Sequence, residues 1–268
     1  MKRVAYFLFL SSTVLGLDTK PWFGNAWELE GQGAFTYSRY PKVDQALVPL
    51  AHPSNDQLLA FNLGLSTNSS SSFDGEVEFT NTPRLPWSTR SVAVQWRKLF
   101  WDDVLGDFLS VATGTVVRFV PTRALTDVST PYHSNCNFEV NLAIGKEWAC
   151  EAMWRYRMSG YFGLGMANRG FPWTRLRLFW EKNREDQQQI QLFGDAYFGF
   201  GPKREVNIKH FHGYAQIHHQ SVDLGISYRY LWPIWGSISL EGGYRILAHS
   251  FPEHLFFVTA SYRLPFSF

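Results

Sequence analysis

The chain has 268 residues, and its 25 basic and 23 acidic side chains give a formal net charge of only +2 at pH 7. Because there is also no basic tract, the charge gives no reason to expect a nucleic-acid partner. The mean hydropathy of −0.19 is that of a soluble protein. Beyond residue 17, no apolar run approaches the ~20 residues that a helical span requires.

The aromatic content points the other way. The chain carries 11 Trp, 12 Tyr and 23 Phe, more aromatic surface than the core of a soluble domain of this size needs. A transmembrane β-barrel reconciles the two facts, because its strands face lipid on one side only and its aromatic side chains collect at the two interfaces. The alternative is a soluble β-sandwich, which salt or carbonate would extract, whereas a barrel needs detergent.

The first residues have the pattern of a secretory signal peptide. A positive start is followed by a mostly apolar stretch at residues 4–17, and Val14 and Gly16 suit the −3 and −1 positions of a cleavage site. The stretch is too short, and wrongly flanked, for a transmembrane helix. We therefore expect residues 1–16 to be a signal peptide and residues 17–268 to be the barrel. The alternative is a short buried N-terminal strand or helix.

Alternation of apolar and polar residues predicts the strands. The count depends on the stretch after Phe200, where 204–211 alternates weakly but 213–231 keeps one register throughout. With 201–212 as a loop, the total is about twelve, and bacterial single-chain barrels have an even number of strands. A strand at 204–211 would make thirteen. The predicted strands are 26–40, 57–68, 73–81, 91–101, 107–121, 137–144, 148–164, 173–182, 187–200, 213–231, 236–248 and 255–268.

The connections between these strands alternate in length. With both termini in the periplasm, the long connections face outward and the short ones inward, the asymmetry that outer-membrane barrels show. The long connections are 41–56, 81–89, 120–136, 165–172, 201–212 and 249–254. The short ones are 69–72, 102–105, 145–147, 183–186 and 232–235.

The C-terminal strand is the most specific feature of the sequence. Its apolar residues follow period two and end on a terminal phenylalanine, with Thr259, Ser261, Arg263 and Ser267 between them. This pattern resembles the C-terminal signature strand of bacterial outer-membrane β-barrels, which implies recognition by the barrel-assembly machinery. The residues that carry the signal are Tyr262, Leu264, Phe266 and Phe268.

This resemblance implies a fold and a compartment. The leader, the closing strand and the Trp-rich hairpins are together similar to those of outer-membrane proteins, and the middle of the chain is similar to uncharacterised barrel proteins of chlamydia-like bacteria. We therefore expect an all-β transmembrane antiparallel barrel in the cell outer membrane of a Gram-negative bacterium. The expected partners are outer-membrane lipid and the assembly machinery, and no cofactor is expected.

Charged residues on the strands are the candidates for the interior, since a charge facing hydrocarbon costs several kcal/mol. They either form a salt-bridged filling or line a water-filled pore with an acidic wall opposite a basic one. The first interpretation predicts a structural envelope barrel, and the second predicts a porin-like channel for small solutes. The predicted lumen-facing charges are Glu28, Glu30, Glu76, Glu78, Arg155, Arg157, Arg175, Arg177, Glu241 and Arg245, with Arg263 on the last strand.

A different function follows from His219 and Ser221. The His-x-Ser spacing resembles that of outer-membrane phospholipase and of the barrel deacylases that trim lipid A, in which the His is the general base for a Ser nucleophile. These families place an orienting Asn or Glu about a dozen residues after the Ser, and this chain has Trp232, Pro233 and Ile234 there. A lipid-acting hydrolase is therefore the alternative hypothesis, and the chain is expected not to be an enzyme.

The remaining metal and thiol candidates are few. Cys136 and Cys150 are candidates for a disulfide in an oxidising envelope, although two thiols alone do not decide the pairing. No Cys or His spacing suits zinc. His210 and His212 lie two residues apart in a basic loop, where a solvated loop is favoured over a metal site.

Overall fold

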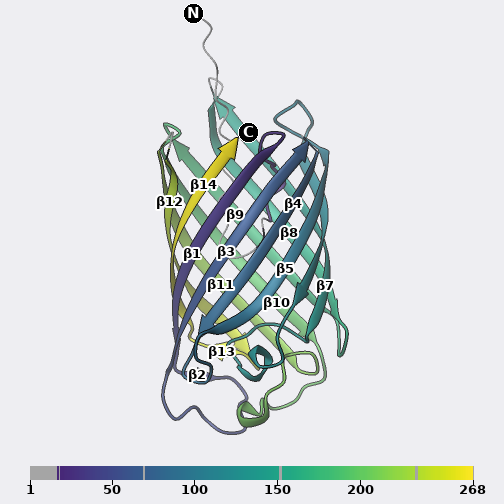
Figure 1. The fold of residues 1–268 in the computed structure, drawn as a ribbon, viewed down its shortest axis with the longest axis vertical. Coiled ribbons are helices and arrows are strands. Elements are labelled where there is room, and N and C mark those ends of the chain that lie inside the picture. Colours follow the sequence, from purple (N-terminus) through teal and green to yellow (C-terminus); the bar gives the residue numbers. More distant parts are fainter. Residues whose placement is uncertain (1–16, 18, 69, 151–152, 233–234, 268) are drawn as a thin grey trace, which may run out of the picture.

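Twelve of the described strands form a closed antiparallel barrel (Figure 1). The computed structural model describes residues 17, 19–68, 70–150, 153–232 and 235–267. Neighbours in the wall follow chain order, and β1 pairs with β14 to close it. The barrel strands are β1 (Glu28–Tyr40), β3 (Ser54–Asn68), β4 (Ser71–Asn81), β5 (Ser88–Trp101), β6 (Ser110–Phe119), β7 (Cys136–Cys150), β8 (Met153–Ala167), β9 (Trp173–Arg184), β10 (Gln188–Phe200), β11 (His218–Trp232), β12 (Gly236–His249) and β14 (Phe256–Ser267). Among the described residues, no helix is long and apolar enough to cross a membrane.

The strands carry polar side chains inward and apolar side chains outward. On β4, Asp74, Glu76 and Glu78 are buried, while Phe73, one residue earlier, is 45% exposed. This is the reverse of a soluble domain, and a barrel wall in lipid requires it, because hydrocarbon surrounds the outer face. The all-β transmembrane barrel expected from the sequence is confirmed.

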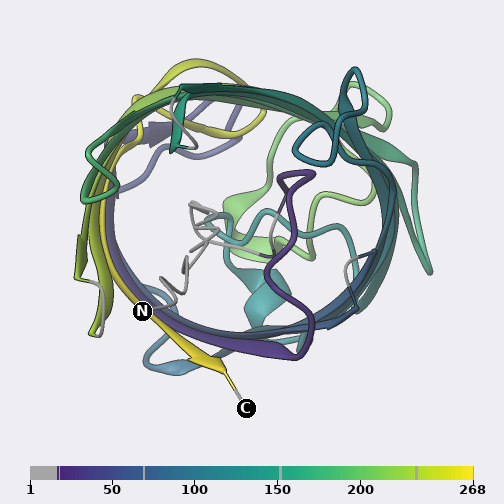
Figure 2. The same cartoon turned by 90° about the horizontal axis from the view of Figure 1, so that it is seen from above.

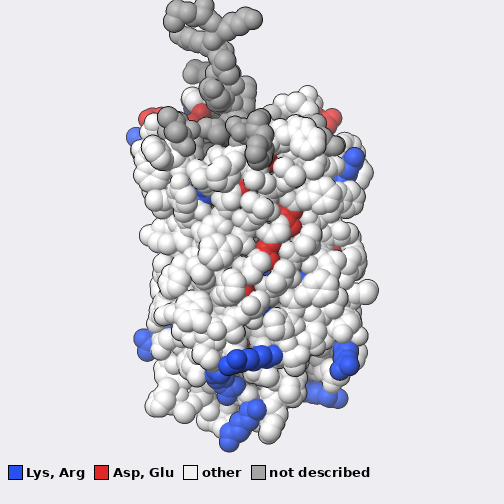
Figure 3. All heavy atoms as spheres, viewed as in Figure 1, with Lys and Arg blue, Asp and Glu red and all other residues white. Residues whose placement is uncertain are grey.

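Exposed aromatic side chains border the apolar outer face at both ends. We call the end where β1 begins and β14 stops the terminal end, and the opposite end the loop end. On the side of the barrel seen in Figure 3, the middle of the outer face is almost entirely uncharged apart from a diagonal row of acidic atoms, and most of the Lys and Arg side chains in view lie at the loop end. Exposed aromatic residues at the terminal end are Trp27, Phe100, Trp101, Trp148, Trp232 and Trp235. At the loop end they are Trp87, Phe119, Phe138, Phe171, Phe200 and Phe256.

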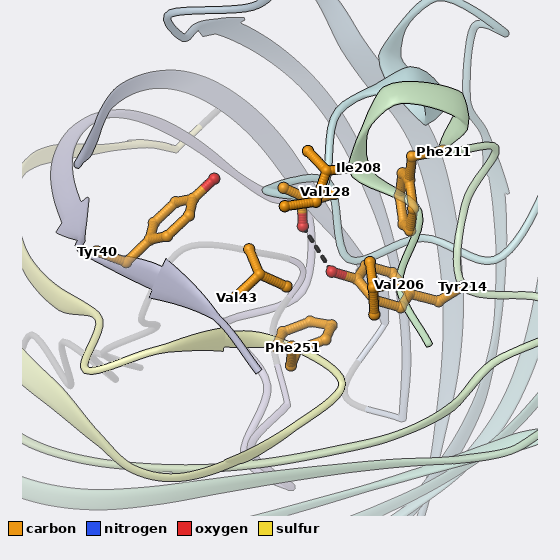
Figure 4. Close-up of a cluster of buried hydrophobic side chains, with 8 residues drawn as sticks. All are labelled: Tyr40, Val43, Val128, Val206, Ile208, Phe211, Tyr214 and Phe251. Carbon is orange, nitrogen blue, oxygen red and sulfur yellow. Dashed lines mark hydrogen bonds between the residues drawn. The ribbon is translucent and has the colours of Figure 1, made fainter. Parts of the chain in front are cut away.

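The long connections fold over the loop end and form a hydrophobic cluster there (Figure 4). The short strands β2 (Lys42–Val43) and β13 (Pro252–Glu253) pair with each other, and η1 (Ala124–Thr126) and η2 (Ile208–His210) belong to the same set of loops. The Tyr214 hydroxyl donates a 2.7 Å hydrogen bond to a backbone carbonyl of the loop after β6. We call the cluster the loop lid; it consists of Tyr40, Val43, Val128, Val206, Ile208, Phe211, Tyr214 and Phe251.

The described residues that shortly precede β1 lie inside the barrel, and Figure 2 shows their purple trace within the ring of strands. Residues 17 and 19–24, which we call the N-terminal segment, include side chains that are fully buried among interior residues. Leu17 packs against Ala93 and Val116, and Lys20 is completely buried. The interior is therefore occupied from both ends.

The strand count of twelve agrees with the prediction, but the boundaries differ by five or more residues in two places. Residues 145–147, predicted as a turn, are part of β7, which continues to Cys150. Residues 213–217, predicted as strand, lie in the loop before β11, where Gly213 has a φ of 87° and Tyr214 is held in the loop lid. The stretch 204–211 holds η2 and a single parallel bridge between Ala46 and Val206, in agreement with its assignment as a loop.

The two cysteines do not form the disulfide considered from the sequence. Both are free thiols, and they mark opposite ends of the same strand, β7. At about 3.3 Å per residue, an extended strand of this length separates its ends by several times the ~7 Å limit for a disulfide between Cα atoms. The correction follows from Gly145–Glu147 being extended rather than a turn, because a turn there would have folded the chain back.

The free thiols provide a test of orientation. Cys136 lies at the loop end and Cys150 at the terminal end, and Cys150 is exposed. If the loop end faces outward, a membrane-impermeant maleimide added to intact cells should label Cys136 and should reach Cys150 only after the outer membrane is disrupted. Mass spectrometry of the two peptides reads out the result, and the Cys136→Ser and Cys150→Ser variants identify the signals. Labelling of Cys150 alone would mean the opposite orientation.

Candidate functional site

The interior wall is held together by ion pairs. Most of them join side chains on neighbouring strands, because lumen-facing residues at matched register lie side by side. Their N···O distances are 2.7 Å for Arg118 and Glu76, 2.5 Å for Arg157 and Glu147, 2.7 Å for Arg175 and Asp195, 3.0 Å for Arg177 and Asp195, 2.6 Å for Arg245 and Asp223, and 2.9 Å for Arg263 and Glu30.

Asp195 on β10 shows how the register sets these pairs. It lies opposite Arg177 in the β9–β10 ladder. It also accepts two hydrogen bonds from Arg175, at 2.7 Å from Nη2 and 3.3 Å from Nε. One carboxylate thus serves two guanidinium groups, a geometry that fixes all three side chains. Since breaking such a buried pair leaves an unpaired charge, these contacts are costly to remove.

Acidic and basic side chains alternate around the wall and do not form two opposite walls. Glu76 and Glu78 on β4 neighbour Arg90 on β5 and Arg118 on β6, and Asp223 on β11 neighbours the arginine of β12. The expectation of an acidic wall facing a basic one is therefore wrong. The reason is physical: charges on adjacent strands are close enough to neutralise each other, and a wall of one sign has no such compensation.

The structure places nearly all the predicted interior charges inside the barrel. Six of these charges are buried: Glu76, Glu78, Arg157, Arg177, Glu241 and Arg245. Three more are half-buried: Glu28, Glu30 and Arg175.

Arg155 differs, because it is exposed. The β7–β8 ladder is irregular at Trp148 and Ala149, so the neighbouring Trp154 takes the interior position. The centroid of its ring lies 4.3 Å from the Arg157 guanidinium carbon.

Several functional residues were not singled out from the sequence. Several of the ion-pair partners are among them, because the sequence shows which face a charge lies on but not which residue lies beside it. For the residues on strands, the signal that would have found them is the same period-two alternation that identified the others. These residues are Asp74, Arg90, Arg97, Arg118, Glu139, Glu147 and Asp195. Lys20 was also missed, and its segment has no such alternation.

A cavity of about 270 Å³ lies in the middle of the barrel. Its lining includes Leu17 and Thr19 of the N-terminal segment on one side and Phe251 of the loop lid on the other. The wall between them carries charges of both signs together with aromatic side chains, and it is built by most of the barrel strands. The charged and aromatic lining residues are Glu78, Arg90, Arg118, Glu139, Arg175, Asp195, Asp223, Arg245, Tyr132, Tyr161, Trp173 and Tyr197.

His219 and Ser221 face this interior and not the lipid, and both are buried. The His219 ring stacks on Phe251 at a centroid distance of 5.4 Å and lies 5.0 Å from the ring of His133, and its Nδ1 donates to the Ile217 carbonyl. A base for a lipid ester hydrolase needs access to lipid substrate. The environment of His219 is instead the underside of the loop lid, which gives the hydrolase hypothesis no support.

The C-terminal strand closes the barrel against β1. Tyr262 and Phe266 are exposed on the outer face, and Leu264 is half-buried. Phe268, the last residue of the expected assembly signal, lies outside the described residues, as do residues 1–16. Within the described residues, no group of three or more His, Cys, Asp or Glu side chains is placed to hold a metal ion.

Comparisons with known proteins rest on structure. No family model matches the chain, and no curated protein matches its sequence. The fold is similar to that of an outer-membrane channel from Pseudomonas putida F1, with 7% identity and a TM-score of 0.65 over 92% of this chain and 98% of that one. It is also similar to the NanC porin (10% identity, TM-score 0.54, 88% of this chain and 100% of that one) and to the KdgM porin (8% identity, TM-score 0.51, 86% and 98%).

These likenesses concern the fold alone, since the identities are low. No comparison bears on the predicted similarity to proteins of chlamydia-like bacteria, which stays a prediction. With its closed wall, apolar outer face, aromatic borders and charged interior, the chain has the fold of a bacterial outer-membrane β-barrel.

Proposed function

We propose that the protein is a porin-like channel of the outer membrane through which small polar solutes pass along the barrel. The observation that carries this proposal is the central cavity, whose wall holds charges of both signs. A barrel that serves only as an envelope scaffold can fill its interior with side chains and needs no such space. The solved channel and porins with the same fold support the proposal.

The charge pattern indicates the kind of solute. Because arginines and carboxylates alternate and pair around the cavity, the wall produces no field of a single sign. Neutral or zwitterionic polar solutes suit such a wall better than simple ions of either charge, since each solute dipole finds donors and acceptors. The loop end, in contrast, is basic and raises the local concentration of anions. Its exposed basic residues are Arg39, Lys42, Arg84, Arg123, Arg169, Lys203, Arg204 and Lys209.

The proposal includes a route to the membrane. Residues 1–16 are the signal peptide for export, and the strand carrying Tyr262, Leu264 and Phe266 is the segment that the barrel-assembly machinery recognises. Two facts support the second point: this strand pairs with β1 at the closing seam, and its exposed side chains lie on the lipid-facing side. Outer-membrane lipid is then in contact with the apolar band.

Single-channel recording in a planar bilayer tests the channel. Wild-type protein should give discrete current steps with little preference between small cations and anions at high salt. Replacing Arg175 and Arg177 with glutamine leaves Asp195 without its two partners, so the double variant should shift several-fold toward cations, measured as the reversal potential in a salt gradient.

The matched control is Lys182→Gln, which removes a positive charge from an exposed position on the same strand, β9. It should keep the wild-type reversal potential. Stable insertion without current, both in the wild-type protein and after the loop lid is opened, would contradict the proposed channel.

A further inference from the structure

The N-terminal segment is bound to the wall by its own side chains, as a ligand is. The Lys20 ammonium donates to Glu181 Oε1 at 2.6 Å and to Gln191 Oε1 at 2.9 Å. It also lies 5.3 Å from the ring centroid of Phe179. A carboxylate, an amide oxygen and an aromatic face are the groups that recognise an ammonium. Burying a lysine completely is costly, and these partners on β9 and β10 offset the cost.

Contacts with other strands extend this recognition along the segment. The indole of Trp22 donates to Asp103 Oδ1 at 3.0 Å, and the Arg157 guanidinium carbon lies 4.8 Å from its ring. Phe23 packs in a cluster of buried side chains from the wall, and Arg97 Nη1 donates to the backbone carbonyl of Lys20 at 2.8 Å. Each of these groups belongs to a different part of the wall, so the site is assembled by the barrel and not by the segment itself.

The wall is shaped to receive the segment. Gly145 on β7 has no side chain, and a Cβ placed there would lie 2.7 Å from Pro21 Cγ and 2.7 Å from Trp22 Cη2. Real Cβ atoms do not approach that closely, so any larger residue at this position would displace the segment. The lysine site and this space show that the interior of the terminal half is complementary to the segment in both charge and shape.

We propose that the terminal half of the interior is a binding site for a short extended peptide that carries a lysine followed by aromatic residues. The N-terminal segment is its resident ligand. While it is bound, it closes the terminal side of the central cavity, where Leu17 and Thr19 form part of the lining. When it withdraws, the site is open to a peptide of the same chemistry. The closing role rests on the proposed channel function, whereas the binding site does not.

Two variants displace the resident segment in different ways. Lys20→Met removes the ammonium of the segment and leaves the wall unchanged, so the site is emptied. Gly145→Leu introduces atoms where Pro21 and Trp22 lie, so the site is blocked to the segment and to an added peptide alike. The controls are Lys182→Met on the outer side of β9 and Gly75→Leu, where the nearest atom to a new Cβ is 4.0 Å away. All four proteins are first checked for heat-modifiable gel mobility, which shows that the barrel has folded.

The direct test is binding of a fluorescent synthetic peptide with the sequence of residues 17–24, measured by anisotropy on the full-length folded proteins. We expect saturable binding to Lys20→Met, and an apparent affinity for the wild-type and control proteins lower by about tenfold or more, because their resident segment competes with the peptide. Gly145→Leu should not bind the peptide. A peptide with methionine in place of its lysine should bind Lys20→Met about tenfold more weakly, the effect of losing a charge-assisted hydrogen bond. Equal binding of the two peptides to Lys20→Met, or no binding to it, would overturn the proposed site.

Planar-bilayer recording then tests the closing role. Both variants should be open about tenfold more often than wild type, and the peptide added on the terminal side should block Lys20→Met but not Gly145→Leu. If these variants behave like wild type while opening of the loop lid raises the current, the closing role is wrong and the channel stands. If the peptide binds but no variant conducts, the binding site stands and the channel function fails.

Discussion

Replacing Phe251 with alanine should open the loop end of the barrel and raise the open probability of the channel. Phe251 is 4% exposed and lies at the centre of the loop lid, 4.6 Å from the ring of Tyr214 and stacked on His219. The Arg245 guanidinium carbon lies 4.7 Å from its ring. Truncating a buried phenylalanine costs about 3–5 kcal/mol. When that cost falls on the closed lid alone, it shifts the ratio of closed to open states by roughly a hundredfold or more.

Single-channel recording measures the open probability, and limited proteolysis from the loop side measures exposure of the loops. The control is Phe256→Ala. Phe256 is 47% exposed on the outer face of β14, so its truncation removes no contact in the loop lid. It should leave both measurements unchanged. If the Phe251→Ala variant gives the same channel recordings and the same protease resistance as wild type, the loop lid does not close the loop end of the barrel.

Acidification should also loosen the loop lid, through His133. Its ring stacks on Trp173 at a centroid distance of 4.2 Å, and Tyr197 Oη lies 3.0 Å from its Nδ1. Burial, and then the nearby His219 ring, hold the pKa of His133 well below its ordinary value of 6.5. The closed lid therefore holds His133 neutral, whereas an open lid lets it take up a proton.

The sign of the pH effect follows from this difference. Because the pKa in the closed state is the lower one, the closed lid has its full stability above pH 6.5 and loses stability as the pH falls below that value. The loss is up to about 1.4 kcal/mol per pH unit until the pKa of the closed state is reached. Open probability in a planar bilayer should thus increase between pH 6.5 and pH 5.

His133→Phe keeps a flat ring against Trp173 but cannot be protonated, so it should flatten this pH response while leaving the behaviour at pH 8 close to wild type. The charged residues of the wall are common to both proteins and provide the background response. An unchanged pH profile in the variant would assign the response to another group, of which His219 is the nearest candidate.

Period-two alternation predicted the fold because it is a local property with a direct physical cause. In β4, carboxylates alternate with apolar side chains, and the membrane and the lumen select opposite faces. The same reasoning failed at Gly145, because a glycine followed by two charged residues has the composition of a turn. There the charges have distant partners: Glu147 pairs with Arg157, and Lys146 donates to the carbonyl of Phe108. Such contacts are invisible in a local pattern.

The candidate site was only partly predictable for a related reason. Period-two alternation placed Arg175 and Arg177 in the interior. It is the register between β9 and β10, however, that brings Asp195 beside them as their common partner. The sequence does not state that register. Lys20 could not be assigned at all, since the N-terminal segment has no periodicity, and its place depends on a cavity that only the finished barrel creates.

The loop lid brings together residues from position 40 to position 251, contributed by four connections along the chain. Loop-closure entropy must be overcome before contacts between such distant residues can stabilise anything. The cluster therefore forms late, after the strands that carry its loops have taken their places in the wall. A partly assembled barrel thus has open strand edges and no cover at the loop end, and both defects disappear at the same stage, when the last hairpin reaches β1. Closure of the wall and closure of the interior are in this way coupled, so the protein becomes a barrier only once it is complete.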